Sequence, residues 1–263
     1  MSGFVSSRFE IGETAATIAG DSTHIPRATE AIARTRDDIE RQIARDPFFL
    51  TTFEPYDRRY ATSEVTRRMC EASFSAGVGP MATVAGTIAQ LALEAMVEDG
   101  CEHGWVDNGG DIALSLHKPT VVEVFCEPGS TDAFGFEIGP TDGIIGVCSS
   151  SGRLGHSISL GRADVAVAIA ESAILADALA TSMCNAVRTR ADLSTCFESF
   201  THIDGFIGGL VVLDGDVATG GRVPRIIDLE HNPNKVTAHS IMSSPSYTGN
   251  GLRIVETGQE VRP

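Results

Sequence analysis

The stretch AILADALATSMCNAV, residues 173 to 187, is the feature that most constrains how this chain folds. Its apolar residues predict a buried helix, yet it also carries Asp177, Thr181 and Asn185. Residues four apart stack on one face of a helix, so these three form a polar stripe. A carboxylate inside a protein needs a partner. That partner is either a neighbouring loop, with Thr181 bonding back to its own helix, or backbone amides, water, a metal or a ligand.

The charge and length of the chain limit its partners. The formal net charge is −15, and no cluster of basic residues stands out. Because nucleic-acid binding relies on clustered Lys and Arg that neutralise phosphates, we expect no nucleic-acid partner. The 263 residues suffice for one large domain or two small ones with a sizeable core. A symmetric homo-oligomer such as a dimer is the default expectation.

The cysteines and the N-terminal residues predict a cytoplasmic protein. The six cysteines form no C-x-x-C pair and are irregularly spaced, which favours reduced thiols over a zinc site. The first 20 residues lack the basic start and continuous apolar core of a signal peptide. Apolar runs are interrupted before the roughly 20 residues that a membrane helix needs. We therefore expect no membrane partner.

The order of the expected elements favours an α+β fold with mostly antiparallel sheets. Helices come first, and strands follow with one long helix between them. The chain from residue 222 onward is polar and rich in Pro, Asn and Ser, so we predict one domain over residues 1–221 and a polar arm or tail over 222–263. The expected elements are a strand or hairpin at 9–21, helices at 25–47, 63–76 and 80–100, a loop with an aromatic anchor at 47–57, strands at 104–116, 120–128 and 142–150, two strands joined at Gly161 within 156–170, the helix at 173–187, and a hairpin at 206–221.

Two glycine-containing turns are candidate binding elements. AGVGPMA places Gly77, Gly79 and Pro80 before a long helix, whose free amides suit a phosphate. The alternative is an ordinary turn with the proline in the first helical turn. VDNGGDIAL is either a hairpin turn or a pair of acids that flank a ligand lying over the glycines. Its candidate residues are Asp107, Asn108, Gly109, Gly110 and Asp111.

The segment SSSGRLGHS is the third candidate. Small hydroxyls, a glycine and an arginine provide neutral donors and one bidentate cation for a phosphate or carboxylate. A histidine three residues after the arginine is a candidate general acid or base. The alternative is a polar loop between two strands. The candidates are Ser149, Ser150, Ser151, Gly152, Arg153 and His156, of which Arg153 and His156 are the catalytic candidates.

The order of NGGDI, SSGRLGH and ADALAT resembles the ApbE-like superfamily, the flavin transferases that attach FMN from FAD to proteins. More closely, it resembles an uncharacterised cytosolic branch, over about residues 75 to 190. The resemblance implies a two-lobed α+β T-fold with FAD or FMN between the lobes. It also implies a Mg²⁺ ion held by Asp177 and Thr181, and Gly109 and Gly110 close to the flavin or its adenine part. Ser151, Gly152 and His156 fall where the family has its Ser-Gly loop and its histidine.

Three departures from the family pattern leave three functions open. Ser159 stands where the transferases have an Asp, and Gly77 and Thr83 stand where their helix start has an acid and, shortly after, a Lys. We also expect no lipoprotein or export signal. A site with fewer charged side chains stabilises the charge that develops in a transition state less well. The chain is therefore a Mg²⁺-dependent FMN-transferase-like enzyme acting on a flavin, nucleotide or other phosphorylated molecule, a non-catalytic ligand-binding protein, or an assembly protein that keeps the fold.

Overall fold

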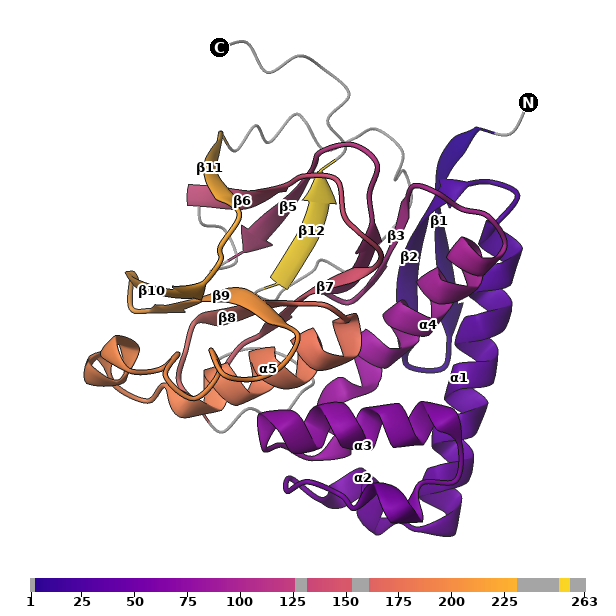
Figure 1. Cartoon of the computed structure of the whole chain (residues 1–263), viewed down its shortest axis with the longest axis horizontal. Helices are drawn as coiled ribbons and strands as arrows, with labels where there is room; N and C mark the ends of the chain where they lie inside the picture. The colour runs from indigo at the N-terminus through magenta and orange to yellow at the C-terminus, as the bar shows by residue number, and fades with distance from the viewer. Residues whose placement is uncertain (1–2, 126–131, 153–160, 231–250, 256–263) are drawn as a thin grey trace.

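Two antiparallel sheets organise the part of the chain that the computed structural model describes, residues 3–125, 132–152, 161–230 and 251–255 (Figure 1). The larger sheet has the order β1-β2-β3-β4-β7-β8-β9-β10 and the smaller one β11-β6-β5-β12. The strands are β1 (Phe4–Ile11), β2 (Thr14–Asp21), β3 (Gly104–Asn108), β4 (Asp111–Ser115), β5 (Thr120–Phe125), β6 (Asp132–Ile138), β7 (Ile145–Ser150), β8 (Val165–Ala170), β9 (Phe206–Leu213), β10 (Asp216–Gly221), β11 (Arg225–Glu230) and β12 (Gly251–Val255).

Helices cover one face of the larger sheet, and the smaller sheet covers the other. In Figure 1, β5, β6, β11 and β12 lie above β7–β10, and α5 lies below them. This layering confirms the α+β class with antiparallel sheets and packed helices. The α-helices are α1 (Ile25–Arg45), α2 (Phe48–Thr51), α3 (Glu64–Ala76), α4 (Val84–Glu98) and α5 (Ala173–Ala186), with short 3₁₀ turns η1 (Arg58–Tyr60), η2 (Pro80–Thr83) and η3 (Arg190–Ser194).

Strand β8, with the sequence VAVAIA, shows how the pattern of side chains builds both layers. Successive side chains of a strand point to opposite faces of the sheet. Ala166, Ala168 and Ala170 belong to the core beneath the helices. Their neighbours Val165, Val167 and Ile169 belong to the core shared with the smaller sheet. Small residues therefore face the helices, which lets α5 approach closely, and branched residues fill the space between the sheets.

Most predicted elements are confirmed, and local signals explain their ends. Ser63 caps α3 by accepting a hydrogen bond from the amide of Thr66. Ser172 does the same for α5 through the amide of Leu175. The turn between β9 and β10 consists of Asp214 and Gly215, both with positive φ (50° and 83°), as a two-residue hairpin turn requires. The hairpin at the start of the chain forms as β1 and β2.

Two segments differ from the expectation. Residues 47–57, expected as a loop, contain the short helix α2, because Phe49 is fully buried and holds one helical turn against the core. Residues beyond 221, expected as an arm, supply β11 and β12, so the smaller sheet includes strands on both sides of that boundary. The expected strand before Gly161 falls in residues 153–160, outside the described part.

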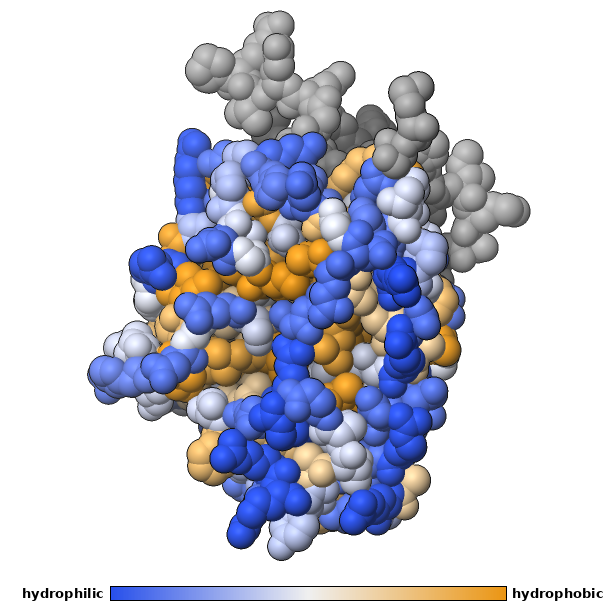
Figure 2. All heavy atoms as spheres, turned by 45° about the vertical axis from the view of Figure 1, so that its right-hand side comes forward, coloured by the Kyte–Doolittle hydropathy of each residue, from blue (hydrophilic) through white to orange (hydrophobic). Residues whose placement is uncertain are grey.

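One helical stretch of the described chain, Pro80–Glu98, is long and apolar enough to cross a membrane by length and composition. However, 56% of its most apolar window is buried inside the protein. Ile88, Leu93 and Met96 of α4 contact the core beneath the larger sheet. The stretch is thus a core helix of this fold. On the surface, hydrophobic residues are visible in the middle of the face that Figure 2 shows, and hydrophilic residues dominate its right-hand edge.

Candidate functional site

The first turn of α4 binds Asp177 of α5. The amide of Gly86 donates a hydrogen bond of 2.8 Å to Oδ2 of Asp177. A Cβ atom at Gly86 would lie 2.2 Å from the carbonyl oxygen of Ala173 and 2.7 Å from Cβ of Asp177, so the two helices meet only because residue 86 has no side chain. Free amides at a helix N-terminus favour a carboxylate. Backbone amides are therefore one partner of the polar stripe on α5.

The turn between β3 and β4 reaches the same end of α4. Gly109 and Gly110 form a two-residue turn with φ values of 72° and 94°, which only glycine adopts readily. The amide of Gly110 donates to Oδ1 of Asp107 at 2.9 Å. Asn108 donates from Nδ2 to the carbonyl of Ala85 at 3.2 Å. This bond ties the predicted glycine turn to the helix start that binds Asp177.

Asp111 lies beside the same group of residues. In the sheet register it pairs with Cys148, whose Sγ donates to the carbonyl of Ala173 at 3.4 Å. Cys148 contacts the core beneath the helices, so the alternation of a strand places Ser150 on this face as well. Ala173 lies one helical turn before Asp177 on α5. The structure thus brings together Asn108, Asp111 and Asp177 and places Ser150 on the same face of the sheet.

Burial and mutual repulsion control the charge of this site. Burial raises the pKa of Asp177 to about 7, against the lowering effect of the Gly86 and Ala85 amides. Burial and then the charge of Asp177 raise the pKa of Asp111 well above its usual range. Burial also raises the pKa of Asp107 to about 6. Two carboxylates in one dry site favour a bound proton or cation, because a second negative charge is otherwise uncompensated.

The donor atoms of the site fit a hard cation. Asp177 and Thr181 are each only 8% exposed, and Oδ1 of Asp111 and Oγ of Ser150 are buried without a hydrogen-bond partner among the described residues. Carboxylate and hydroxyl oxygens suit Mg²⁺, which keeps waters and bridges to phosphate. Within the described ranges, no group of three or more His, Cys, Asp or Glu side chains is arranged to hold a metal. A cation here would therefore need hydroxyl, water or ligand oxygens as well.

Other predicted residues have packing contacts or lie outside the described part. Gly77 ends α3 with a φ of 69°. A Cβ at Gly79 would lie 2.0 Å from the carbonyl oxygen of Thr52, so that glycine permits a close backbone contact. The amide of Gly152 donates to the carbonyl of Ala163 at 2.9 Å, and Ser151 is buried. The ligand-binding roles predicted for these residues stay predictions. Arg153, His156 and Ser159 belong to residues 153–160, outside the described part.

A polar chain that sequence reasoning missed fixes the start of α5. Oε1 of Gln90 accepts a hydrogen bond from the amide of Ala173 at 2.8 Å. Nε2 of Gln90 donates to Glu94 at 2.9 Å, and Arg68 binds both oxygens of Glu94 at 2.7 and 2.8 Å. The four-residue spacing of Gln90 and Glu94 indicates that the two side chains interact on one face of the helix. It does not indicate that Gln90 binds the amide of Ala173, 83 residues away. Through this chain α3 and α4 hold the helix that carries Asp177.

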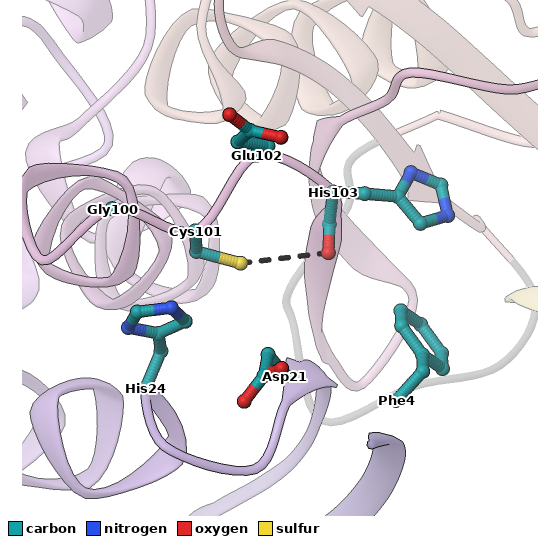
Figure 3. A pocket seen from close by; sticks show the side chains of 7 residues that line it. All are labelled: Phe4, Asp21, His24, Gly100, Cys101, Glu102 and His103. Carbon is teal, nitrogen blue, oxygen red and sulfur yellow. Dashed lines mark hydrogen bonds between the residues drawn. The ribbon is translucent and has the colours of Figure 1, made fainter. Parts of the chain in front are cut away.

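A separate cavity of about 260 Å³ opens at the opposite end of β3 (Figure 3). Asp21, His24 and Cys101 face one another there, and the Cys101 thiol donates to the carbonyl of His103 at 3.4 Å. Burial lowers the pKa of His103. The register pairs Ala16 with Asn108 and Ala19 with Trp105, so the length of β3 separates this cavity from the glycine turn. The lining residues are Phe4, Asp21, His24, Gly100, Cys101, Glu102 and His103.

These features define an α+β protein in which layered antiparallel sheets and two helices enclose an acidic, oxygen-lined site. The fold is similar to that of the flavin transferase ApbE from Vibrio cholerae, with a TM-score of 0.52 and 13% identity, over 85% of this chain and 98% of that one. The apo flavinyl transferase ApbE from Pseudomonas stutzeri gives a TM-score of 0.52 and 11% identity, over 83% and 94%. At these identities the likeness shows the fold alone.

The chain belongs to the family described as AbpE bacteria, whose model matches residues 6–196. It is 41% identical over 231 residues to a UPF0280 protein of Methanocella arvoryzae, covering 88% of this chain and 94% of that relative. A UPF0280 protein of Methanothrix thermoacetophila is 45% identical over 220 residues, covering 83% and 92%. The predicted superfamily is confirmed. The relatives' name assigns no activity, which agrees with an uncharacterised branch.

Proposed function

We propose that this protein binds FAD at the site formed by Asp111, Asp177 and the β3–β4 turn, and transfers its FMN part. The observation that carries the proposal is the pair of buried carboxylates beside the first turn of α4 and the Gly109–Gly110 turn. Such a pair is expected where a cation and an anionic ligand complete the site. Asp177 and Thr181 would hold Mg²⁺, which would neutralise phosphate charge when bound.

The residues of the chain have separate tasks in this proposal. Gly109 leaves the backbone open to a flat or phosphorylated ligand, since it is exposed and no atom lies within 4 Å of a Cβ built on it. Asn108 and Gly86 hold the turn and the carboxylate to α4. The transfer breaks the pyrophosphate bond of FAD, joins the FMN phosphorus to an acceptor hydroxyl, or to water where no acceptor is present, and releases AMP, while the proton of the hydroxyl or water passes to solvent.

The test is AMP release. Wild-type protein is incubated with FAD and Mg²⁺, and AMP is measured by chromatography. Asp177→Asn should abolish AMP release, whereas Asp216→Asn, an exposed position on β10, should leave it unchanged. FAD binding is measured separately by flavin fluorescence. Absence of both FAD binding and AMP release in wild-type protein refutes the proposal.

A second candidate is a ligand-binding protein without turnover, and Thr83 favours it. This side chain stands near the place where the resemblance puts a Lys. It is fully buried, and its Oγ1 donates to the carbonyl of Pro80 at 2.7 Å, so it supplies a structural bond and no positive charge. A site with one cation fewer stabilises a departing phosphate less well. Tight FAD binding without AMP release would select this candidate.

Location and assembly stay predictions. A cytoplasmic homo-oligomer agrees with the sequence features given above. Light scattering during gel filtration tests the oligomer, and fractionation of cells tests the location.

A further inference from the structure

Asp111 has a carboxylate oxygen that no described residue satisfies. The side chain is 9% exposed, and Oδ1 is buried without a hydrogen-bond partner among the described residues. Oγ of Ser150 is in the same condition, with its side chain 6% exposed and on the helix-facing side of the sheet. An unsatisfied buried polar atom costs about 1–3 kcal/mol, and more when charged. We therefore infer that both oxygen atoms bind a group that is not part of the described chain.

The charges near Asp111 indicate which group that is. Asp177 repels Asp111, and within the described ranges neither carboxylate forms an ion pair with a Lys, Arg or His. The Cys148 thiol and the Ser149 amide lie close enough to Asp111 to oppose the rise in its pKa, yet Oδ1 itself accepts no hydrogen bond from a described residue. A neutral ligand atom would leave the repulsion in place, so that only a bound proton could relieve it. A divalent cation satisfies the oxygen and removes the repulsion in one step.

We propose that Asp111 is a ligand of the metal ion, so that its Oδ1 joins Asp177 and Thr181 in an oxygen site for Mg²⁺ or Mn²⁺. The inference rests on the proposed function, which gives only Asp177 and Thr181 to the cation, and it reassigns Asp111 from flavin contact to metal binding. Two carboxylates and a hydroxyl, with water or phosphate completing the shell, form a set that Mg²⁺ accepts. The neighbouring hydroxyl of Ser150 would bind a metal-bound water.

The test measures metal affinity without activity. Full-length protein is stripped with EDTA and titrated with Mn²⁺ by calorimetry and by electron paramagnetic resonance, with and without FAD. Asp111→Asn keeps the shape of the side chain and removes its charge, and should weaken Mn²⁺ binding by about tenfold or more, because affinity follows the ligand charge count. The control is Asp216→Asn, an exposed carboxylate on β10, which should bind Mn²⁺ like wild type.

The outcomes separate this inference from the proposed function. Unchanged Mn²⁺ affinity in Asp111→Asn, with affinity lost in Asp177→Asn, overturns the role of Asp111 and leaves the proposed site. Mn²⁺ binding by wild type without any FAD binding or AMP release in the metal-loaded protein overturns the proposed function and not the metal site. The melting temperature without metal is a second readout, and Asp111→Asn should equal or exceed wild type because the repulsion is gone. A variant that fails to fold would overturn the inference.

Discussion

Gly86 is the position where a single methyl group tests the geometry of the site. A Cβ there would overlap the carbonyl oxygen of Ala173, at 2.2 Å, and Cβ of Asp177, at 2.7 Å. The first of these is backbone, so Gly86→Ala must push α4 away from α5. Overpacking of this kind costs about 1–3 kcal/mol. Weakening the hydrogen bond from the residue-86 amide to the buried Asp177 carboxylate costs about 1.5–3 kcal/mol more. The better helix propensity of alanine offsets about 1 kcal/mol of this loss of stability.

We therefore expect Gly86→Ala to lower the free energy of unfolding by about 1.5–5 kcal/mol. For a chain of this size that lowers the melting temperature by roughly 3–20 °C. Urea titration followed by circular dichroism measures the free energy. Gly139→Ala is the matched control, because a Cβ there meets no atom within 4 Å, and it should change stability by less than about 0.5 kcal/mol. A Gly86→Ala protein whose free energy of unfolding equals or exceeds that of wild type refutes the close contact between α4 and α5.

Three further predictions use the same titration. Gln90→Leu removes the acceptor of the Ala173 amide and should cost about 1–3 kcal/mol; no loss would mean that the polar chain does not hold α5. Phe49→Ala should cost about 3–5 kcal/mol, because Phe49 is fully buried; a loss below 1 kcal/mol would contradict its anchoring role. Without divalent cations, wild-type stability should fall as pH rises from about 4 to 7, since folded Asp177 keeps its proton up to a pKa of about 7 whereas the unfolded chain releases it near 3.9. Asp177→Asn should reduce the dependence of stability on pH over this range. An equal dependence in both proteins would contradict the raised pKa of Asp177.

The sequence predicted the fold well where local signals act. Pro26 and Ser63 mark helix starts through backbone geometry and hydrogen bonds within a few positions of each residue. The order of helices and strands gave the α+β class. Helix α2 was missed because one buried aromatic ring, Phe49, decides it, and a four-residue helix has no periodic pattern. The strands beyond residue 221 were missed because β11 and β12 owe their place to distant partners in β6 and β5.

The candidate site was predicted in part for a similar reason. The four-residue spacing of Asp177 and Thr181 revealed a polar stripe, and the resemblance identified its neighbours. Neither showed that the stripe meets the amide of Gly86, because that contact joins residues 91 positions apart. The role of Gly86 follows from the distance between two helices, which no local pattern encodes. The same limit applies to Gln90 and the amide of Ala173.

Close packing and charge depend on each other at this site. Gly86 and Gly146 both lie against the backbone of Ala173, where a Cβ would come within 2.2 and 2.3 Å of its atoms. Larger residues would hold α5 away from α4 and from the sheet, and Asp111 and Asp177 would then be separated and wetter. The repulsion of the two carboxylates opposes the approach, while the apolar contacts of α4 and α5 favour it. A cation that binds both carboxylates would remove this repulsion. Metal binding should therefore stabilise the α4–α5 contact, and a weaker contact should lower the affinity for metal.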